Sequence, residues 1–129
     1  MISCLLLGAA QRHVTGMEGE ETTLPCDHGQ NTQIINQIIW YSTDNNQTVL
    51  AKYQRNIYNL WNVTVDIPVH LRDRLKWPYP GGKLMTISRT QLDDEADYVC
   101  SVHWDSGSVN VSVKLTVFGK CLNIIVDCV

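Results

Sequence analysis

The sequence lacks a long hydrophobic run, a strong excess of one charge and any helical repeat. No apolar stretch approaches the roughly 20 residues that a membrane-spanning helix needs, so we expect any membrane anchor to lie outside this chain. The net charge of −3 comes from 10 basic and 13 acidic residues, which gives no reason to expect nucleic acid as a partner. No window of ten residues shows helical periodicity. This absence argues against a parallel α/β sheet.

Arrangements of catalytic or metal-binding residues are also missing. The four histidines are dispersed, without a His-x-x-x-His or Cys-x-x-Cys pair that would predict zinc. The acidic run Asp93–Asp97 lacks the spacing of a calcium loop. No Ser/His/Asp order or phosphate-binding glycine loop occurs. We therefore predict a binding protein with no catalytic residues, metal or cofactor.

What the sequence does contain is a series of short segments with β-strand character. They are rich in β-branched and aromatic residues or alternate apolar with polar positions, and turn-forming stretches such as Pro78–Gly82 separate them. This pattern predicts an all-β sandwich or barrel. The expected strands are Thr22–Cys26, Ile34–Ser42, Thr48–Tyr53, Lys83–Ser88, Ala96–His103 and Val109–Val117.

The two ends of the chain differ from its middle. Met1–Ala10 is apolar and ends in small residues, which predicts either the remnant of a secretory signal peptide or a buried first strand. We assign the domain to residues 11–118 and expect 119–129 to be a connecting segment or a tail. Within that last segment, Cys121 and Cys128 could close a small loop or link two chains.

Cysteines and sequons both predict an extracellular or cell-surface protein. Five cysteines, at positions 4, 26, 100, 121 and 128, indicate an oxidising compartment. Three Asn-x-Ser/Thr tripeptides predict N-linked glycosylation and fit the secretory route, although such tripeptides also arise by chance. Their asparagines are Asn46, Asn62 and Asn110.

Cys26, Trp40 and Cys100 have the most specific spacing in the chain. The tryptophan follows the first cysteine by 14 residues, and the second cysteine follows the first cysteine by 74. This is the Cys…Trp…Cys pattern of an immunoglobulin sandwich, in which a disulfide joins the sheets and the indole packs against it. Tyr98, two residues before Cys100, occupies the position whose hydroxyl bonds back to the backbone of the preceding turn.

These motifs together resemble the V-set immunoglobulin family, and Asp93–Ser108 looks like a lambda light-chain variable domain. The resemblance implies a V-type Greek-key sandwich of two antiparallel sheets, with additional strands within Thr48–Val63. It also implies an ion pair between Arg74 and Asp97. Two marks of antigen receptors are missing: the last strand has no Phe-Gly-x-Gly bulge, and Thr43 replaces the glutamine at which antibody domains meet.

One sheet of this sandwich is expected to carry the contact surface. Alternation turns apolar side chains outward where there is no core to fill, which usually marks a contact surface; scattered surface hydrophobics are the alternative. In the following loop, the Trp104 indole either anchors a partner or folds back over the sandwich. The expected partner-binding residues are Ile39, Tyr41, Val99, His103, Trp104, Asp105 and Lys114, with Ser101 and Asn110 on the same face.

The resemblance implies recognition rather than catalysis. The leading hypothesis is an immune-receptor-like domain that binds a protein ligand and pairs as a homodimer through this face. The alternative is an adhesion or co-signalling domain that acts by homophilic pairing. A glycan on Asn110 would hinder a flat dimer and shift recognition to the loops.

Overall fold

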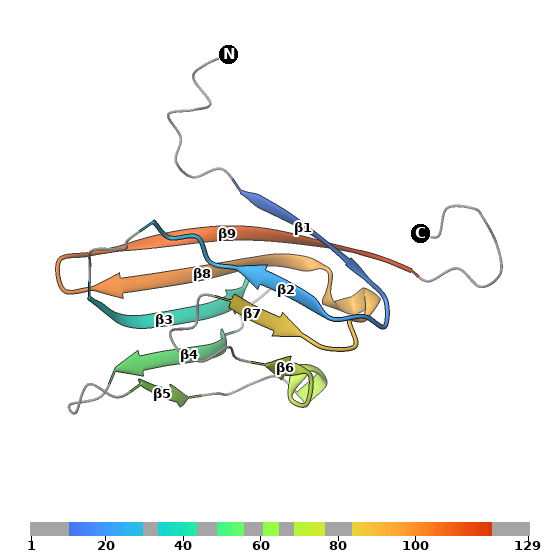
Figure 1. Cartoon of the computed structure of the whole chain (residues 1–129), viewed down its shortest axis with the longest axis horizontal. Coiled ribbons are helices and arrows are strands. Elements are labelled where there is room, and N and C mark those ends of the chain that lie inside the picture. The colour runs from blue at the N-terminus through green and yellow to red at the C-terminus, as the bar shows by residue number, and fades with distance from the viewer. Residues whose placement is uncertain are drawn as a thin grey trace, which may run out of the picture.

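The protein is a sandwich of two β-sheets. The computed structural model describes residues 11–29, 34–43, 49–55, 61–64, 69–76 and 84–119. Within these ranges, a six-stranded sheet of order β1-β9-β8-β3-β4-β5 packs against a three-stranded sheet of order β2-β7-β6 (Figure 1). The expected all-β sandwich is therefore confirmed, and the barrel alternative is not adopted.

The elements follow one another along the chain without a regular α-helix in the described part. The strands are β1 (Arg12–Met17), β2 (Thr22–Pro25), β3 (Ile35–Ser42), β4 (Val49–Arg55), β5 (Trp61–Thr64), β6 (Leu75–Lys76), β7 (Leu84–Ile87), β8 (Ala96–Trp104) and β9 (Gly107–Phe118). Two single-turn 3-10 helices are η2 (Val69–Leu71) and η3 (Leu92–Asp94).

Pairing within the sheets is antiparallel except at one edge. β1 pairs with β9 in parallel, from Arg12 opposite Val113 to Met17 opposite Phe118. β8 in turn pairs over its whole length with the Gly107–Leu115 part of β9 without a register shift, so this part of the last strand has no bulge. β5 pairs with β4 and supplies an additional strand of the kind that the V-set resemblance implied.

The core lies between the sheets around one disulfide. Cys26, just after β2, is bonded to Cys100 of β8, and their Cα atoms lie 5.9 Å apart. The indole of Trp40 on β3 is fully buried in the same cluster. Linking residues 74 positions apart removes chain entropy from the unfolded state worth roughly 4 kcal/mol in the loop-closure description. The predicted bond and its buried tryptophan are both present.

A second buried cluster closes one end of the sandwich. Arg74, just before β6, makes two hydrogen bonds to Asp94 of η3, from Nη1 at 2.7 Å and from Nη2 at 2.9 Å. Its remaining donors reach backbone carbonyls, including that of His70 at 3.0 Å. The hydroxyl of Tyr98 donates to the Asp94 carbonyl, which is the bond to the preceding turn that its sequence position predicted.

The expected ion pair between Arg74 and Asp97 is wrong. Tyr98 and Cys100 point inward, so alternation along β8 turns Asp97 to the opposite side of the sheet. There, Asp97 accepts a hydrogen bond from Gln11 Nε2 at 3.2 Å. Asp94 is the carboxylate that the η3 turn carries into the interior, and its hydrogen bond to the guanidinium raises the pKa of Arg74 above its ordinary value.

Candidate protein-binding face

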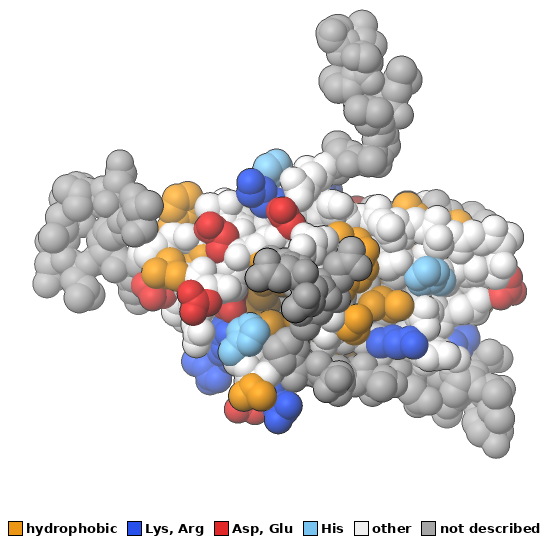
Figure 2. All heavy atoms as spheres, turned by 180° about the vertical axis from the view of Figure 1, so that it is seen from behind, with side chains coloured by type: hydrophobic (Ala, Val, Ile, Leu, Met, Phe, Trp, Pro, Cys, Tyr) orange, Lys and Arg blue, Asp and Glu red, His pale blue; other side chains and the backbone are white. Residues whose placement is uncertain are grey.

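The six-stranded sheet has one side turned away from the smaller sheet, and we call this side the outer face. Figure 2 views the molecule from behind and shows hydrophobic side chains near the middle of this face, with histidine, lysine and arginine side chains around them. Alternation places each residue: Ile38, Trp40, Tyr98 and Cys100 are buried toward the core, so their neighbours in sequence face outward. The outer face includes Ile39 and Tyr41 of β3, Val49 and Lys52 of β4, Val99, Ser101 and His103 of β8, and Asn110, Ser112 and Lys114 of β9.

One half of the outer face, on β3 and β4, is mainly apolar. Ile39 and Tyr41 are half-buried, and Val49, directly opposite Tyr41, is 45% exposed. Lys52 lies opposite Ile39 and is also half-buried. We call these four residues the β3–β4 half. Its three apolar side chains adjoin one another in register, which distinguishes them from scattered surface hydrophobics.

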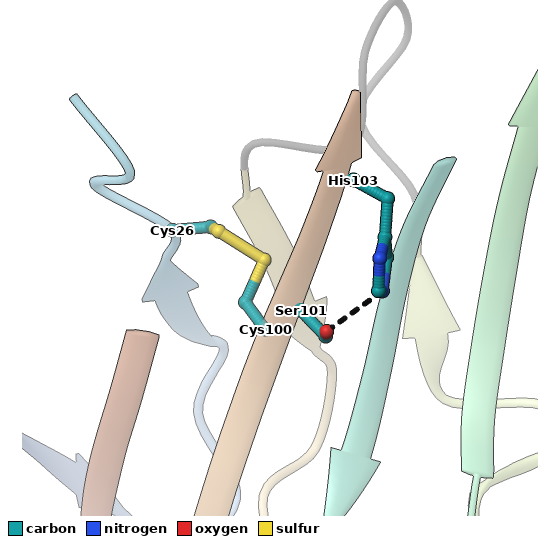
Figure 3. The surroundings of a disulfide bond; sticks show 4 residues. All are labelled: Cys26, Cys100, Ser101 and His103. Carbon is teal, nitrogen blue, oxygen red and sulfur yellow. Dashed lines mark hydrogen bonds between the residues drawn. A yellow bond between two sulfur atoms is a disulfide. The ribbon is translucent and has the colours of Figure 1, made fainter. Parts of the chain in front are cut away.

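The other half of the outer face, on β8 and β9, is mainly polar. Ser101 lies opposite Asn110, and His103 lies opposite Ser108. Ser101 Oγ and His103 Nε2 are hydrogen-bonded at 2.9 Å, on the side of β8 away from the disulfide (Figure 3). Asn110 is exposed. We call this region the β8–β9 half.

Two of the expected partner-binding residues differ in accessibility. Val99, on the central strand of the face, is only 7% exposed because the neighbouring strands place Tyr41 and Ser112 on either side of it. It forms the floor of the apolar region and offers little area of its own. Lys114 is exposed and lies opposite Asp97, so the face ends in charged side chains.

Trp104 does not stand at a loop tip. It is the last residue of β8, where it pairs with Gly107, and its partly buried side chain packs against the core cluster. A Cβ atom on Gly107 would lie only 3.1 Å from the indole Cζ2, so this glycine makes room for the ring. The structure therefore adopts the second alternative, in which the indole folds back over the end of the sandwich.

The turn between β8 and β9 is short and held in place. Only Asp105 and Ser106 separate the two strands. Asp105 Oδ1 accepts a hydrogen bond from Asn36 Nδ2 of β3 at 2.6 Å, and the Arg55 Nε donates to the Ile35 carbonyl at 3.2 Å nearby on the same sheet. Asp105 is exposed, but its carboxylate already has a partner within the domain.

Val49 and Lys52 were missed by the sequence reasoning. The period of two is interrupted in β4, where the adjacent residues Leu50 and Ala51 are both buried. The cause is a register shift between Trp40 and Tyr41 in the pairing of β3 with β4. A strand with a bulge shows no simple alternation, so its outward residues could not be read from the pattern.

Several other sequence predictions fall on residues outside the described ranges or remain without a test. Asn46, Cys4, Cys121 and Cys128 lie outside those ranges, and Asn62 lies on β5.

The acidic run Asp93–Asp97 has structural partners within the domain. Asp94 binds Arg74, and Glu95 Oε1 accepts a hydrogen bond from the Val117 backbone N–H at 2.9 Å. Over the described residues, no group of three His, Cys, Asp or Glu side chains is placed to hold a metal ion.

Comparisons with known proteins agree with this architecture. A family model described as the immunoglobulin V-set domain matches residues 9–118. The chain therefore belongs to the immunoglobulin V-set family. A search of curated proteins returned no match.

Solved structures with the same fold include cell-surface proteins. The extracellular domain of the voltage-gated sodium channel beta4 subunit aligns with a TM-score of 0.64 at 17% identity, covering 86% of this chain and 93% of that one. Tim-1 aligns with a TM-score of 0.62 at 19% identity, covering 89% and 98%. The extracellular portion of mouse CD200RLa aligns with 0.60 at 16% identity, covering 85% and 57%. At identities this low, the structural alignments show a shared fold. No helix in the part of the chain described here is long and apolar enough to cross a membrane.

Proposed function

We propose that this domain is an extracellular recognition module of the immune-receptor type, which binds protein through its outer face and pairs there with a second copy of itself. The observation that carries the proposal is the apolar β3–β4 half, with Val49 at 45% exposure beside Tyr41 and Ile39. Apolar side chains next to one another on an otherwise polar sheet are typical of the central part of a protein interface. The proposed activity is binding and involves no chemical step.

The geometry favours the sheet over the loops as the contact surface. Trp104 is held against the core and Asp105 is bonded to Asn36, so neither is as free to engage a partner as the sequence predicted. By contrast, Tyr41 combines a large apolar ring with a polar hydroxyl, the combination that interfaces favour. Pairing with a second copy is supported by the beta4 subunit, whose extracellular domains are described as parallel homodimers with a role in cell–cell adhesion.

Adhesion by homophilic pairing is the second candidate, and it uses the same face. The two candidates differ in where the second copy resides: on the same cell for a dimeric receptor, or on an opposing cell for adhesion. Beads coated with the protein distinguish them, because clustering of the beads requires contacts between surfaces. Clustering would favour adhesion, and soluble dimers without clustering would favour the receptor.

Sedimentation velocity of the secreted protein, from low to high micromolar concentration, tests the proposal. We expect reversible dimers that Val49→Lys weakens at least tenfold, because a charge would be desolvated in an apolar contact. The matched control is Val69→Lys, since Val69 is a 78% exposed valine on η2, outside the outer face. A protein that stays monomeric at high micromolar concentration, with and without its glycans, would exclude self-pairing.

A further inference from the structure

We infer that Asn110 carries an N-linked glycan that covers the β8–β9 half of the outer face and leaves the β3–β4 half as the protein contact. This inference rests on the proposed function for its second part, the location of the contact. Its first part, the modification itself, concerns Asn110 alone.

The chemistry requires an Asn-x-Ser/Thr acceptor and a donor sugar. Asn110-Val111-Ser112 supplies the acceptor. The donor class is an oligosaccharide linked to a lipid pyrophosphate, which the secretory pathway provides. A bond forms between Asn110 Nδ2 and C1 of the first sugar, while the bond from C1 to the pyrophosphate oxygen breaks. The lipid pyrophosphate leaves with the electron pair, and the amide nitrogen loses one proton.

The folded structure leaves space for the product. Asn110 is exposed, and its side chain lies on the outward side of β9. Its cross-strand neighbour is Ser101, whose hydroxyl is already bonded to His103. A sugar lying over this region would therefore cover polar side chains and would not bury exposed apolar area.

The register separates the glycan from the apolar contact. Ile39, Ser101 and Asn110 occupy one row across the sheet, and Tyr41, Val99 and Ser112 occupy the next outward row along the strands. With strands about 4.8 Å apart, Ile39 lies about 10 Å from Asn110, since two strand spacings separate them. Val49 is three strands away and one outward row along, so its separation from Asn110 is about 16 Å. The attached sugars thus begin on the far side of the face from Val49, so the glycan would leave the β3–β4 half open and would not shift recognition to the loops, contrary to what we expected from the sequence alone.

Charge also distinguishes the surroundings of Asn110 from the β3–β4 half. Lys52 is the charged residue of the β3–β4 half and lies beside Ile39. The cross-strand partners of Ser101 and His103 on β3 and β9 are uncharged, namely Ile39, Gln37, Asn110 and Ser108, and the charged pair of Asp97 and Lys114 lies further along β8 and β9. The polar surface around Asn110 suits a sugar cover. An apolar surface with one cation beside it suits a protein contact with a polar rim.

Peptide mapping by mass spectrometry tests the modification on protein secreted from mammalian cells. We expect a glycopeptide containing Asn110 that disappears in Asn110→Gln and in Ser112→Ala, two variants that remove the acceptor by different changes. Ser112→Thr retains the acceptor and should retain the glycan. An unmodified Asn110 in the secreted wild-type protein would overturn the inference.

Glycan placement tests the location of the contact. We expect Asn110→Gln and Ser112→Ala to change the dimer dissociation constant by less than about threefold. The double substitution Lys52→Asn with Gln54→Thr creates an acceptor within the β3–β4 half and should abolish pairing relative to Lys52→Asn alone, which makes the same change at position 52 without creating an acceptor.

The outcomes separate this inference from the proposed function. Tenfold tighter or weaker pairing after loss of the Asn110 glycan would show that this glycan adjoins the contact, and would overturn the division of the face. A monomeric protein in every glycoform would instead exclude self-pairing, and with it a contact on the β3–β4 half, while the mass spectra would still decide whether Asn110 is modified.

Discussion

Arg74 and Asp94 face each other with two parallel hydrogen bonds, and their side chains are 5% and 0% exposed. The guanidinium also binds the backbone carbonyls of His70, Ser88 and Arg89. One buried cation thus links the segment before β6, the turn after β7 and the η3 helix. Asp94 in turn accepts from the Gln91 backbone at 2.7 Å, so the pair organises the whole end of the sandwich.

We therefore expect loss of this ion pair to lower the stability of the domain. We expect Arg74→Ala and Asp94→Ala each to lower the free energy of unfolding by about 3–5 kcal/mol, because each leaves an uncompensated buried charge. The exposed pair of Lys76 and Glu21 provides the control, and Lys76→Ala should cost under about 1 kcal/mol. Guanidinium denaturation of the oxidised protein measures these changes. Asp97→Ala checks the corrected assignment, and a loss as large as that of Asp94→Ala would contradict it.

Tyr98 contributes to the same end through its hydroxyl. Tyr98→Phe should lower the free energy of unfolding by about 1–2 kcal/mol, because the buried Asp94 carbonyl loses its hydrogen-bond donor. The aromatic ring and its packing are kept. Thermal unfolding followed by circular dichroism measures the effect. An unchanged melting temperature would mean that the hydroxyl contributes nothing to stability.

Trp104 is expected to act on stability more than on binding. Trp104→Ala should lower the free energy of unfolding by about 2–3 kcal/mol, somewhat below the range for a fully buried tryptophan, because the indole is only partly covered. Asp105→Ala, one residue further, removes the bond to Asn36 and should cost about 1 kcal/mol. Denaturation measures the stability of each variant, and sedimentation measures its pairing. Loss of pairing in Trp104→Ala with an unchanged melting temperature would reinstate the indole as a partner anchor.

Arg89 adopts a left-handed backbone conformation with φ of 48°. Its carbonyl accepts a hydrogen bond from Arg74 Nη1 at 3.1 Å, so this turn supplies one of the acceptors of the buried guanidinium. Arg89→Gly should raise the free energy of unfolding by about 0.5 kcal/mol, since relief of the strain exceeds the entropy cost of glycine. Arg89→Ala keeps the strain and should have little effect. Destabilisation by the glycine substitution would show that the arginine side chain itself matters.

The fold was predictable wherever a sequence pattern corresponds to a single structure. The alternation of Val109–Val117 is matched by burial of Val113, Leu115 and Val117, and the spacing of Cys26, Trp40 and Cys100 described the core correctly. The short strands β1, β5 and β6 gave no comparable signal. Their positions follow from long-range pairing with β9, β4 and β7, and such context overrides local preference.

The candidate site was predictable only in part, for two physical reasons. Alternation placed Ile39, Tyr41 and Asn110 on the outer face, but it cannot say how far neighbours cover a residue, and Val99 is almost fully covered. The partner of Arg74 depended on how the chain turns at η3. Four carboxylates lie within Asp93–Asp97, and the backbone conformation, which the pattern does not encode, selects the one that enters the core.

The parallel pairing of β1 with β9 bears on how the protein is made. Synthesis produces β1 first and β9 last among the described strands, yet they are neighbours in the sheet. Until β9 has left the ribosome, β1 has no partner in its sheet and β8 keeps one bare edge, a state open to edge-to-edge association. Contacts between distant parts of a chain also form slowly. In the nascent chain the edge of β8 therefore stays open to such association until β9 is complete.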